Sequence, residues 1–144
     1  MLSQTLLPIL RDRYPQRGLI ESPTAEPFAV FPGIHPGIRS VSIYDDGHEV
    51  TLCVDELTHG HFSEYTEGLS DAQREARIID SVVEFLDALF ADRVVVWGEQ
   101  HSGGWYRPEY RGAGSNTVVP AGRTGRGALV HEFVWSGPYP QGNA

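Results

Sequence analysis

The stretch 39-RSVSIYDDGHEVTLCV-54 carries the clearest structural signal in the chain. Two extended runs flank Asp46-Gly47, a dipeptide that accepts the positive backbone φ angles of a tight hairpin turn. Alternate residues of a strand share a face, so the apolar residues of both arms lie on one side. These residues are Val41, Ile43, Val50, Leu52 and Val54. We expect that side to face the core, with Glu49 and Thr51 pointing away from it.

The segment 70–91 is predicted to form one long helix. Ser70 and Gln73 have the spacing of a capping box, in which each side chain accepts a hydrogen bond from the other residue's backbone N–H. Apolar residues recur at helical spacing and predict a buried stripe. The stripe comprises Ala72, Ala76, Ile79, Val82, Val83, Leu86, Leu89 and Phe90. A second helix is predicted over residues 2–14, where apolar residues leave arginine and aspartate on the opposite side.

The order of these elements predicts an α+β fold. Short extended runs precede the long helix, and further apolar runs at 93–97, 105–107 and 129–135 follow it. We expect a mixed or mostly antiparallel sheet of five to seven strands, with the helix 70–91 and the N-terminal helix packed on one face. The 144 residues suit a single domain, 1–144.

Two glycine-rich segments are predicted to be less ordered than the rest. Residues 112–127 lack an apolar period, which indicates a mobile Gly-rich loop, and residues 137–144 are expected to fray as a tail.

Composition narrows the class of protein. No apolar run approaches the ~20 residues of a membrane-spanning helix, and the first residues lack the pattern of a signal peptide, so we expect a cytoplasmic protein without a membrane partner. The single cysteine, Cys53, leaves no intrachain disulfide and no zinc site built on several thiolates. All 11 basic residues are arginine, which favours a GC-rich bacterial source.

Charge is distributed unevenly. Residues 40–100 hold 14 acidic and 3 basic side chains, a balance of about −11. Nucleic acid is not an expected partner, because phosphate binding depends on clustered positive charge. A basic protein is the expected one. Candidate contact residues are the acids on the wet side of the long helix, and the Trp, Tyr and Arg types that dominate interface hot spots. They are Asp80, Glu84 and Asp87, then Trp105, Tyr106 and Arg107.

A histidine-carboxylate cluster gives an alternative. If residues 55–64 are extended, His59 and His61 project from one face, and Asp55 or Glu64 completes a ligand set suited to Zn²⁺, Fe²⁺ or Mn²⁺. The competing interpretation is a polar strand end whose histidines hydrogen-bond to nearby carboxylates and backbone.

Other catalytic signals are weak. Cys53 faces away from the hairpin's apolar side, where a lone cysteine is more often inert. The glycine-rich stretch 122–127 has no lysine and precedes a strand, unlike a phosphate-binding loop. We therefore identify no catalytic residue and no cofactor-binding residue, and an enzyme is the less favoured class.

Three stretches of the sequence carry a resemblance to a domain family. They are Tyr44-Asp45-Asp46-Gly47 through Thr58-His59-Gly60-His61-Phe62, the acidic helix, and Gly104-Trp105-Tyr106-Arg107-Pro108. Together they are similar to members of an uncharacterised bacterial domain family over about two thirds of the chain. The resemblance implies no activity for any residue.

Three functional hypotheses follow. The leading one is a noncatalytic, cytoplasmic protein-interaction domain with an acidic surface, of the kind that an immunity-protein-like inhibitor of a basic partner would present. It needs no cofactor. The alternative is a metal-dependent hydrolase that uses His59 and His61 to hold a divalent transition metal. The third is a domain that forms a homodimer or supports a larger assembly.

Overall fold

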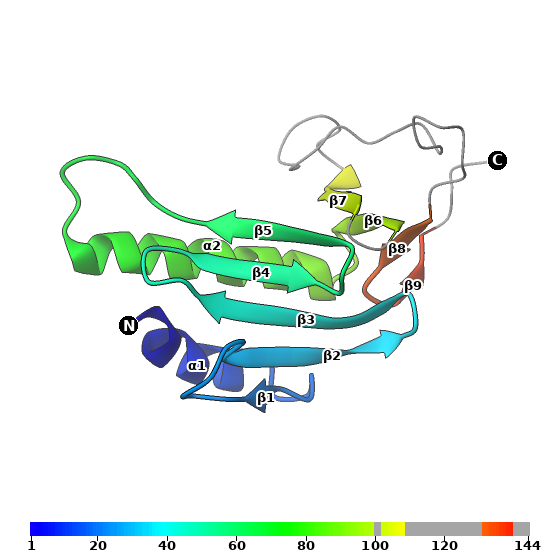
Figure 1. Ribbon diagram of the computed structural model, residues 1–144, viewed down its shortest axis with the longest axis horizontal. Coiled ribbons are helices and arrows are strands. Elements are labelled where there is room, and N and C mark those ends of the chain that lie inside the picture. Colours follow the sequence, from blue (N-terminus) through cyan, green and yellow to red (C-terminus); the bar gives the residue numbers. More distant parts are fainter. Residues whose placement is uncertain (100–101, 109–130, 140–144) are drawn as a thin grey trace.

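The predicted hairpin lies at the centre of a five-stranded sheet, here called sheet A, in this computed structural model (Figure 1). β3 (Ile38–Asp45) and β4 (Val50–Val54) pair antiparallel, and Ile43 lies opposite Leu52 with both side chains buried. The connecting turn spans residues 46–49, and within it Gly47 has a φ of +88°. The hairpin is therefore confirmed, with a turn longer than the Asp-Gly dipeptide alone.

The structure describes residues 1–99, 102–108 and 131–139. Three more strands complete sheet A: β1 (Ile20–Glu21), β2 (Ala29–His35) and β5 (Thr58–Phe62). The strand order is β1-β2-β3-β4-β5, and every neighbouring pair is antiparallel. Strands that follow one another along the chain therefore lie side by side, which short connections allow.

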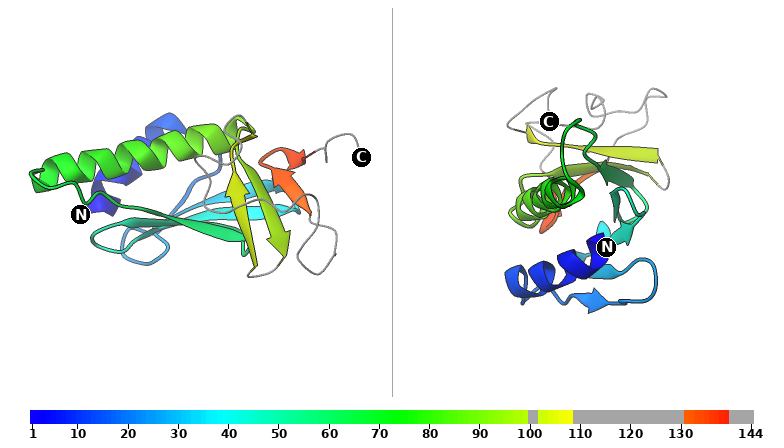
Figure 2. Two further views of the ribbon diagram at one scale, coloured as in Figure 1. Left: turned by 90° about the horizontal axis from the view of Figure 1, so that it is seen from above. Right: turned by 90° about the vertical axis from the view of Figure 1, so that its left-hand side faces the viewer.

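Both helices cover the same face of sheet A, as predicted. Figure 2 shows α1 (Leu2–Arg13) and α2 (Asp71–Phe90) on one side of the strands. The capping box of α2 is confirmed: Ser70 Oγ accepts a hydrogen bond from the Gln73 N–H at 3.1 Å, and Gln73 Oε1 accepts one from the Ser70 N–H at 2.9 Å. Local sequence thus sets where α2 begins.

The buried stripe of α2 differs from the predicted one. Ala72 and Ala76 are exposed, and burial starts only at Ile78. Phe85 and Ala88, which the predicted stripe omitted, are also buried. The first turns of α2 extend beyond the ends of the strands, past the turn between β3 and β4 (Figure 1), so no strand covers them. The later turns lie over the sheet and contact apolar neighbours on a wider part of the helix surface.

The last strands form a second sheet rather than joining the first. Sheet B has the order β7-β6-β8-β9, with β6 paired antiparallel to both β7 and β8. Its strands are β6 (Val95–Glu99), β7 (Ser102–Tyr106), β8 (Glu132–Val134) and β9 (Gly137–Pro138). The predicted α+β class is confirmed, and its strands are divided between a five-stranded and a four-stranded sheet.

The two predictions of low order concern segments that the structure describes only in part. The glycine-rich loop 112–127 lies outside the described residues. The segment 137–144 begins with β9, which pairs with β8, and residues 140–144 lie outside the described part. Neither of the described helices is long and apolar enough to cross a membrane.

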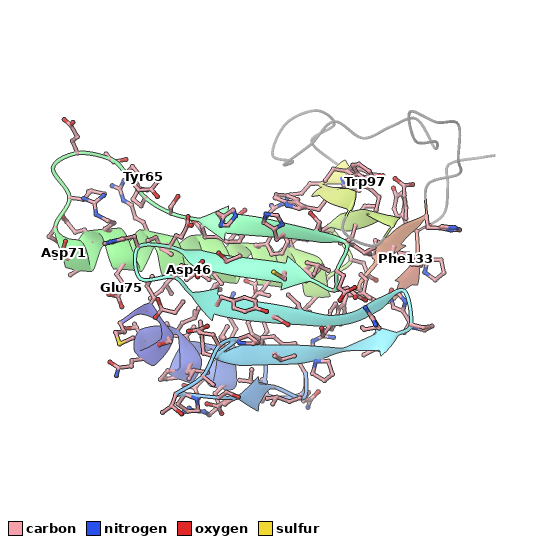
Figure 3. The ribbon with its side chains drawn as sticks, in the orientation of Figure 1. Asp46, Tyr65, Asp71, Glu75, Trp97 and Phe133 are labelled. Carbon is pink, nitrogen blue, oxygen red and sulfur yellow. The ribbon has the colours of Figure 1, made fainter. Side chains whose placement is uncertain are left out.

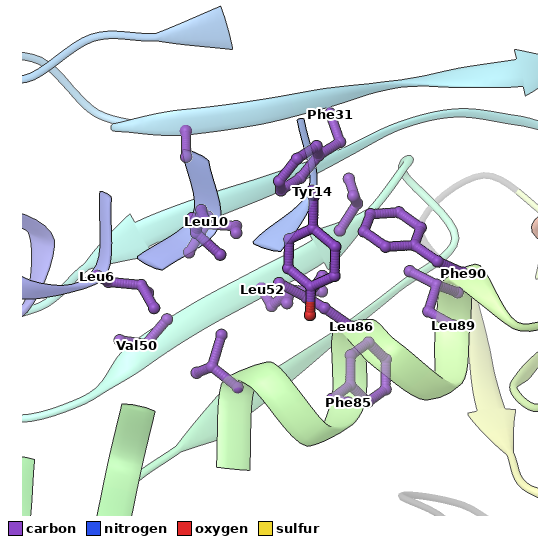
Figure 4. Packing of buried hydrophobic residues seen from close by; sticks show 14 of the residues in the cluster. Leu6, Leu10, Tyr14, Phe31, Val50, Leu52, Phe85, Leu86, Leu89 and Phe90 are labelled. Atoms are coloured by element: carbon purple, nitrogen blue, oxygen red, sulfur yellow. The ribbon is translucent and has the colours of Figure 1, made fainter. Parts of the chain in front are cut away.

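An aromatic cluster joins the helices to the sheet (Figure 4). The rings of Tyr14, Phe31 and Phe90 meet edge to face, with centroid separations between 5.1 and 5.7 Å. Trp135, which follows β8, packs on Phe90 at 4.9 Å and is 1% exposed. Edge-to-face contacts at these distances are favourable for aromatic rings, so one core connects α1, α2 and both sheets.

We predict that Ser70→Ala lowers the free energy of unfolding by about 1 kcal/mol, because it removes the side-chain oxygen that accepts the Gln73 N–H. Urea denaturation followed by circular dichroism measures the change. Ser63→Ala serves as the control, because Ser63 is exposed and lies outside both helices. Equal stability of the Ser70 variant and the unchanged protein would contradict the assigned role of the cap.

Candidate functional site

The two faces of sheet A differ in character. Side chains pointing toward α1 and α2 are apolar and buried, as the predicted core face requires. The opposite face, here called the open face, is not covered by either helix, and Figure 3 is drawn from that side. Strand register aligns Val30, Ser42, Cys53 and His59 in one row across its centre.

A hollow of about 780 Å³ lies on the open face over β3 and β4. Small side chains, Ser42 and Cys53 among them, line it, and Tyr44 and His59 also contribute. Gly103 of β7 approaches it from sheet B. The lining at Ser42 and Cys53 is uncharged, and the charged side chains of Arg39, Asp55 and Glu56 also line the hollow.

Cys53 is in a poor setting for nucleophilic chemistry. Burial raises the pKa of its thiol, and the nearby charge of Asp46 raises that pKa further. A thiol with a raised pKa carries little of the reactive thiolate at neutral pH. The raised pKa gives no support to nucleophilic chemistry at Cys53, and the inert role of this side chain stays a prediction.

Asp55 is tied to Arg39. Its carboxylate accepts hydrogen bonds from the Arg39 side chain, with Nη2 to Oδ1 at 2.7 Å, and from the Arg39 backbone N–H at 2.8 Å. Burial alone would raise the pKa of Asp55, but the hydrogen bonds from Arg39 outweigh it and the pKa is lowered. We call this neutral pair the Arg39–Asp55 pair; it occupies one end of the open face.

The predicted histidine pair is confirmed as a pair of neighbours. His59 and His61 project from β5 with ring centroids 5.0 Å apart. Asp55, the predicted third ligand, is engaged by Arg39 instead, and within the described part of the chain it does not form a compact ligand group with the two histidines. The structure thus brings together two residues of the predicted metal set, and the metal itself stays a prediction.

A different set of potential ligands surrounds His61. Its Nδ1 lies 3.4 Å from Glu49 Oε1 and 3.1 Å from Thr51 Oγ1, and Thr51 donates a hydrogen bond to Asp46. One ligand atom each from Asp46, Glu49 and His61 lie within 4.8 Å of one another. Carboxylate and imidazole ligands suit a divalent transition metal.

Four carboxylates gather at the end of sheet A opposite the Arg39–Asp55 pair. We call Glu26, Asp45, Asp46 and Glu49 the acidic tip. Their partners in the described residues are backbone N–H groups, the Thr51 hydroxyl and His61, and no described arginine forms an ion pair with them. The negative charge of the tip is therefore not balanced by neighbouring arginines.

Two of the acids predicted as contact residues on α2 have arginine partners, unlike those of the acidic tip. Glu84 pairs with Arg107 at 3.0 Å, and Asp87 pairs with Arg13 at 2.5 Å. Asp80 is exposed on the same helix. Two of the three predicted contact acids thus have their charge offset by an arginine, so the α2 face is less negative than its sequence indicates.

The predicted aromatic contact residues, Trp105 and Tyr106, make contacts within the protein itself. Trp105 packs edge to face on Phe85, with centroids 5.1 Å apart, and the Tyr106 hydroxyl donates to Glu132 at 2.9 Å. The Arg107 side chain is 13% exposed. Of the predicted contact residues, Arg107, which directly follows β7, and Glu84 of α2 are brought together.

The chain matches no family model, no curated protein and no solved structure. Function therefore has to be argued from the geometry of the site.

Sequence reasoning missed the acidic tip as a site. The sequence assigns Asp46 to the hairpin turn and Glu49 to the second strand, on the side away from the core, and Glu26 lies in a separate loop. The Glu26 carboxylate reaches the Asp45 N–H at 3.1 Å, a contact between residues distant in sequence. A signal existed in the close spacing of three acids around the turn, but sequence does not tell which acids have an arginine partner.

We predict that the stabilising contact of Asp87 is lost in acid. Hydrogen bonds from Arg13 and then from Tyr14 lower the pKa of Asp87 below its ordinary value of 3.8, although burial opposes them. A lowered pKa contributes stability above the unfolded-state pKa, and the contribution disappears as pH falls through the folded-state pKa. The difference in unfolding free energy between the unchanged protein and Asp87→Asn should be constant above about pH 5 and shrink below pH 3.8.

Urea denaturation at a series of pH values measures this difference. Asp80→Asn is the matched control on the same helix, since the Asp80 carboxylate makes no ion pair in the described part of the chain. The assignment fails when the Asp87→Asn difference is independent of pH.

Proposed function

We propose that this chain is a noncatalytic protein-interaction domain whose acidic tip binds a basic partner protein. The supporting observation is the set of carboxylates at the tip, Glu26, Asp45, Asp46 and Glu49, with no arginine paired to them among the described residues. Like charges held close together repel one another, and a cationic partner removes that repulsion. A basic ligand at the tip would therefore relieve a repulsion that no described arginine offsets.

The α2 face is a weaker candidate for the same partner. Glu84 and Asp87 already have arginine partners within the chain, so a partner's cation would compete with Arg107 and Arg13. Asp46 and Glu49 present no such competition. We therefore move the expected contact from the predicted acids of α2 to the tip.

Exposed negative charge of this kind mainly raises the rate of association with a basic protein. Complementary fields steer a basic protein toward the tip and speed encounter, and rim charges change the association rate more than the dissociation rate. An inhibitor that must capture its target quickly benefits from this effect. We propose that the domain acts in the cytoplasm as an immunity-protein-like inhibitor of such a target.

We predict that the double variant Asp46→Lys/Glu49→Lys loses the partner. The variant and the unchanged protein are immobilised and exposed to extracts of the source organism at about 0.15 M salt, where the Debye length is about 8 Å. The unchanged protein should retain one stoichiometric basic protein, and the double variant should retain at least about tenfold less, a change of about 1.4 kcal/mol.

Asp80→Lys is the control for net charge, because it changes the sign of an exposed acid away from the tip. It should retain the partner. Equal loss with Asp80→Lys would point to a general charge effect, and recovery of no stoichiometric basic protein by the unchanged chain would count against the proposal.

The second candidate is a metal-dependent hydrolase. Its supporting observation is the approach of Asp46, Glu49 and His61, whose ligand atoms lie within 4.8 Å of one another. A divalent metal held there would lower the pKa of a bound water and supply the nucleophile for hydrolysis. This set replaces Asp55 and shares only His61 with the predicted set His59, His61 and Asp55.

Calorimetric titration with Mn²⁺ or Zn²⁺ of protein made without a histidine tag tests this candidate. If the set is Asp46, Glu49 and His61, then Glu49→Gln should weaken binding at least about tenfold, or about 1.4 kcal/mol, while His59→Ala leaves it nearly unchanged. The reverse pattern would identify the predicted His59–His61 set. Absence of binding to the unchanged protein would remove the metal hypothesis.

A further inference from the structure

The central row of the open face carries no formal charge. Register places Ile20 opposite Val30, Val30 opposite Ser42, Ser42 opposite Cys53, and Cys53 opposite His59, across all the strands of sheet A. Ser42 and His59 are polar, as the solvent-facing side of an antiparallel sheet usually is, whereas Ile20 and Val30 are apolar and Ile20 is 55% exposed. The row thus combines apolar and uncharged polar side chains on the face that neither helix covers.

The shape of the face agrees with that pattern. The hollow of about 780 Å³ lies over this row, with the small side chains of Ser42 and Cys53 in its lining and the larger ones of Tyr44 and His59 beside them. Its volume falls within the roughly 300–1,000 Å³ of typical binding pockets. A row of bulky charged residues would have filled it.

Charge is placed at the two ends of the strands and differs between them. At one end Arg39 pairs with Asp55 at 2.7 Å and also lies 3.8 Å from the Glu56 carboxylate, so an arginine offsets part of the acidic charge there. At the other end lies the acidic tip. There Thr51 and His61 of the open face contact each other, and they also contact Asp46 and Glu49, respectively. An uncharged centre with charged groups only at the rim is the usual arrangement of a protein interface.

We infer that the open face is the docking surface for the partner, and that it binds one segment of the basic partner: a stretch with an uncharged middle and arginine or lysine at the end that lies on the acidic tip. This inference rests on the proposed function, and it adds where the partner lies and in which direction. The uncharged part of the segment covers the hollow over Ser42 and Cys53, and its cationic end meets Asp46 and Glu49.

A second copy of this chain is the less suitable occupant. It carries the same net charge of −8, so two copies facing each other would add to the repulsion at the tips. A basic segment instead matches the sign of the acidic tip, whose carboxylates have no arginine partner among the described residues. Charge complementarity thus selects a basic partner over self-association.

Cys53 makes the inference testable, because it is the only cysteine in the chain and lies in the hollow. Two synthetic peptides of about ten residues, long enough to span about 33 Å when extended, serve as probes. Both contain the same uncharged residues and arginines. The arginines are grouped at one end of the first peptide and spaced evenly along the second.

Binding is followed by fluorescence anisotropy, and the rate of Cys53 alkylation by iodoacetamide is followed by mass spectrometry. At a peptide concentration of about ten times its Kd, the grouped peptide should slow alkylation about tenfold, because only the free protein reacts. The evenly spaced peptide should protect less. Asp46→Asn/Glu49→Gln should weaken binding of the grouped peptide at least about tenfold, or about 1.4 kcal/mol, and Asp80→Asn/Glu84→Gln should leave it nearly unchanged.

Ser42→Tyr separates the face from the tip. It fills the hollow without changing charge, so the ratio of alkylation rates with and without the grouped peptide should approach one, while circular dichroism confirms that the variant is folded. Protection that persists in Ser42→Tyr would overturn the docking surface.

The remaining outcomes are also decisive. Binding that depends on Asp46 and Glu49 but leaves the Cys53 alkylation rate unchanged overturns the docking surface and leaves the proposed function standing. Binding that is insensitive to the tip variants contradicts both. Failure of the grouped peptide to bind overturns the docking surface alone, since the proposed function is tested with the partner itself. Protection of Cys53 that rises with protein concentration in the absence of peptide would show that a second copy covers the face.

Discussion

The register of the β3–β4 pair is the constraint on which the rest of the structure depends. Side chains alternate between the two faces of a strand, so a one-residue slip of β4 along β3 would reverse the two faces of β4. Val50, Leu52 and Val54 would then point away from the helices, and Cys53 would lie beneath them. The burial of the apolar residues against α1 and α2 therefore fixes the core and, by the same alternation, fixes which side chains form the open face.

Local features of the fold and the packing of both helices on one face of the sheet were predictable from sequence, and the pairing of particular strands and side chains was not. The Asp46-Gly47 turn and the Ser70 capping box depend on residues close together in the chain, and both are present. The buried stripe of α2 was predicted to begin at Ala72, but the first turns of the helix extend past the sheet and burial starts at Ile78. Division of the strands between two sheets likewise depends on pairings across the chain, which periodicity does not contain.

In the candidate site, too, some relations between residues were predictable from sequence and others were not. That His59 and His61 share a face follows from strand alternation and was predictable. The partner of Asp55 was not, because Arg39 reaches it from the start of β3, distant in sequence. His61 lies close to Asp46 and Glu49 because the register of β5 against β4 places His61 opposite Thr51. Sequence supplied the residue types, and the register of β4 and β5 decided which of them meet.

Net charge in a sequence does not say where charge lies in the folded protein. The arginines paired with Glu21, Asp55, Glu84 and Asp87 connect elements of the fold and offset those acids locally. Exposed pairs of this kind contribute little to stability, so their main effect is on where charge lies on the surface. Asp46 and Glu49 have no arginine partner among the described residues, and their carboxylates repel each other at close range. An arrangement that costs stability at one end of an uncharged face is better explained by a ligand that meets it than by the needs of the fold.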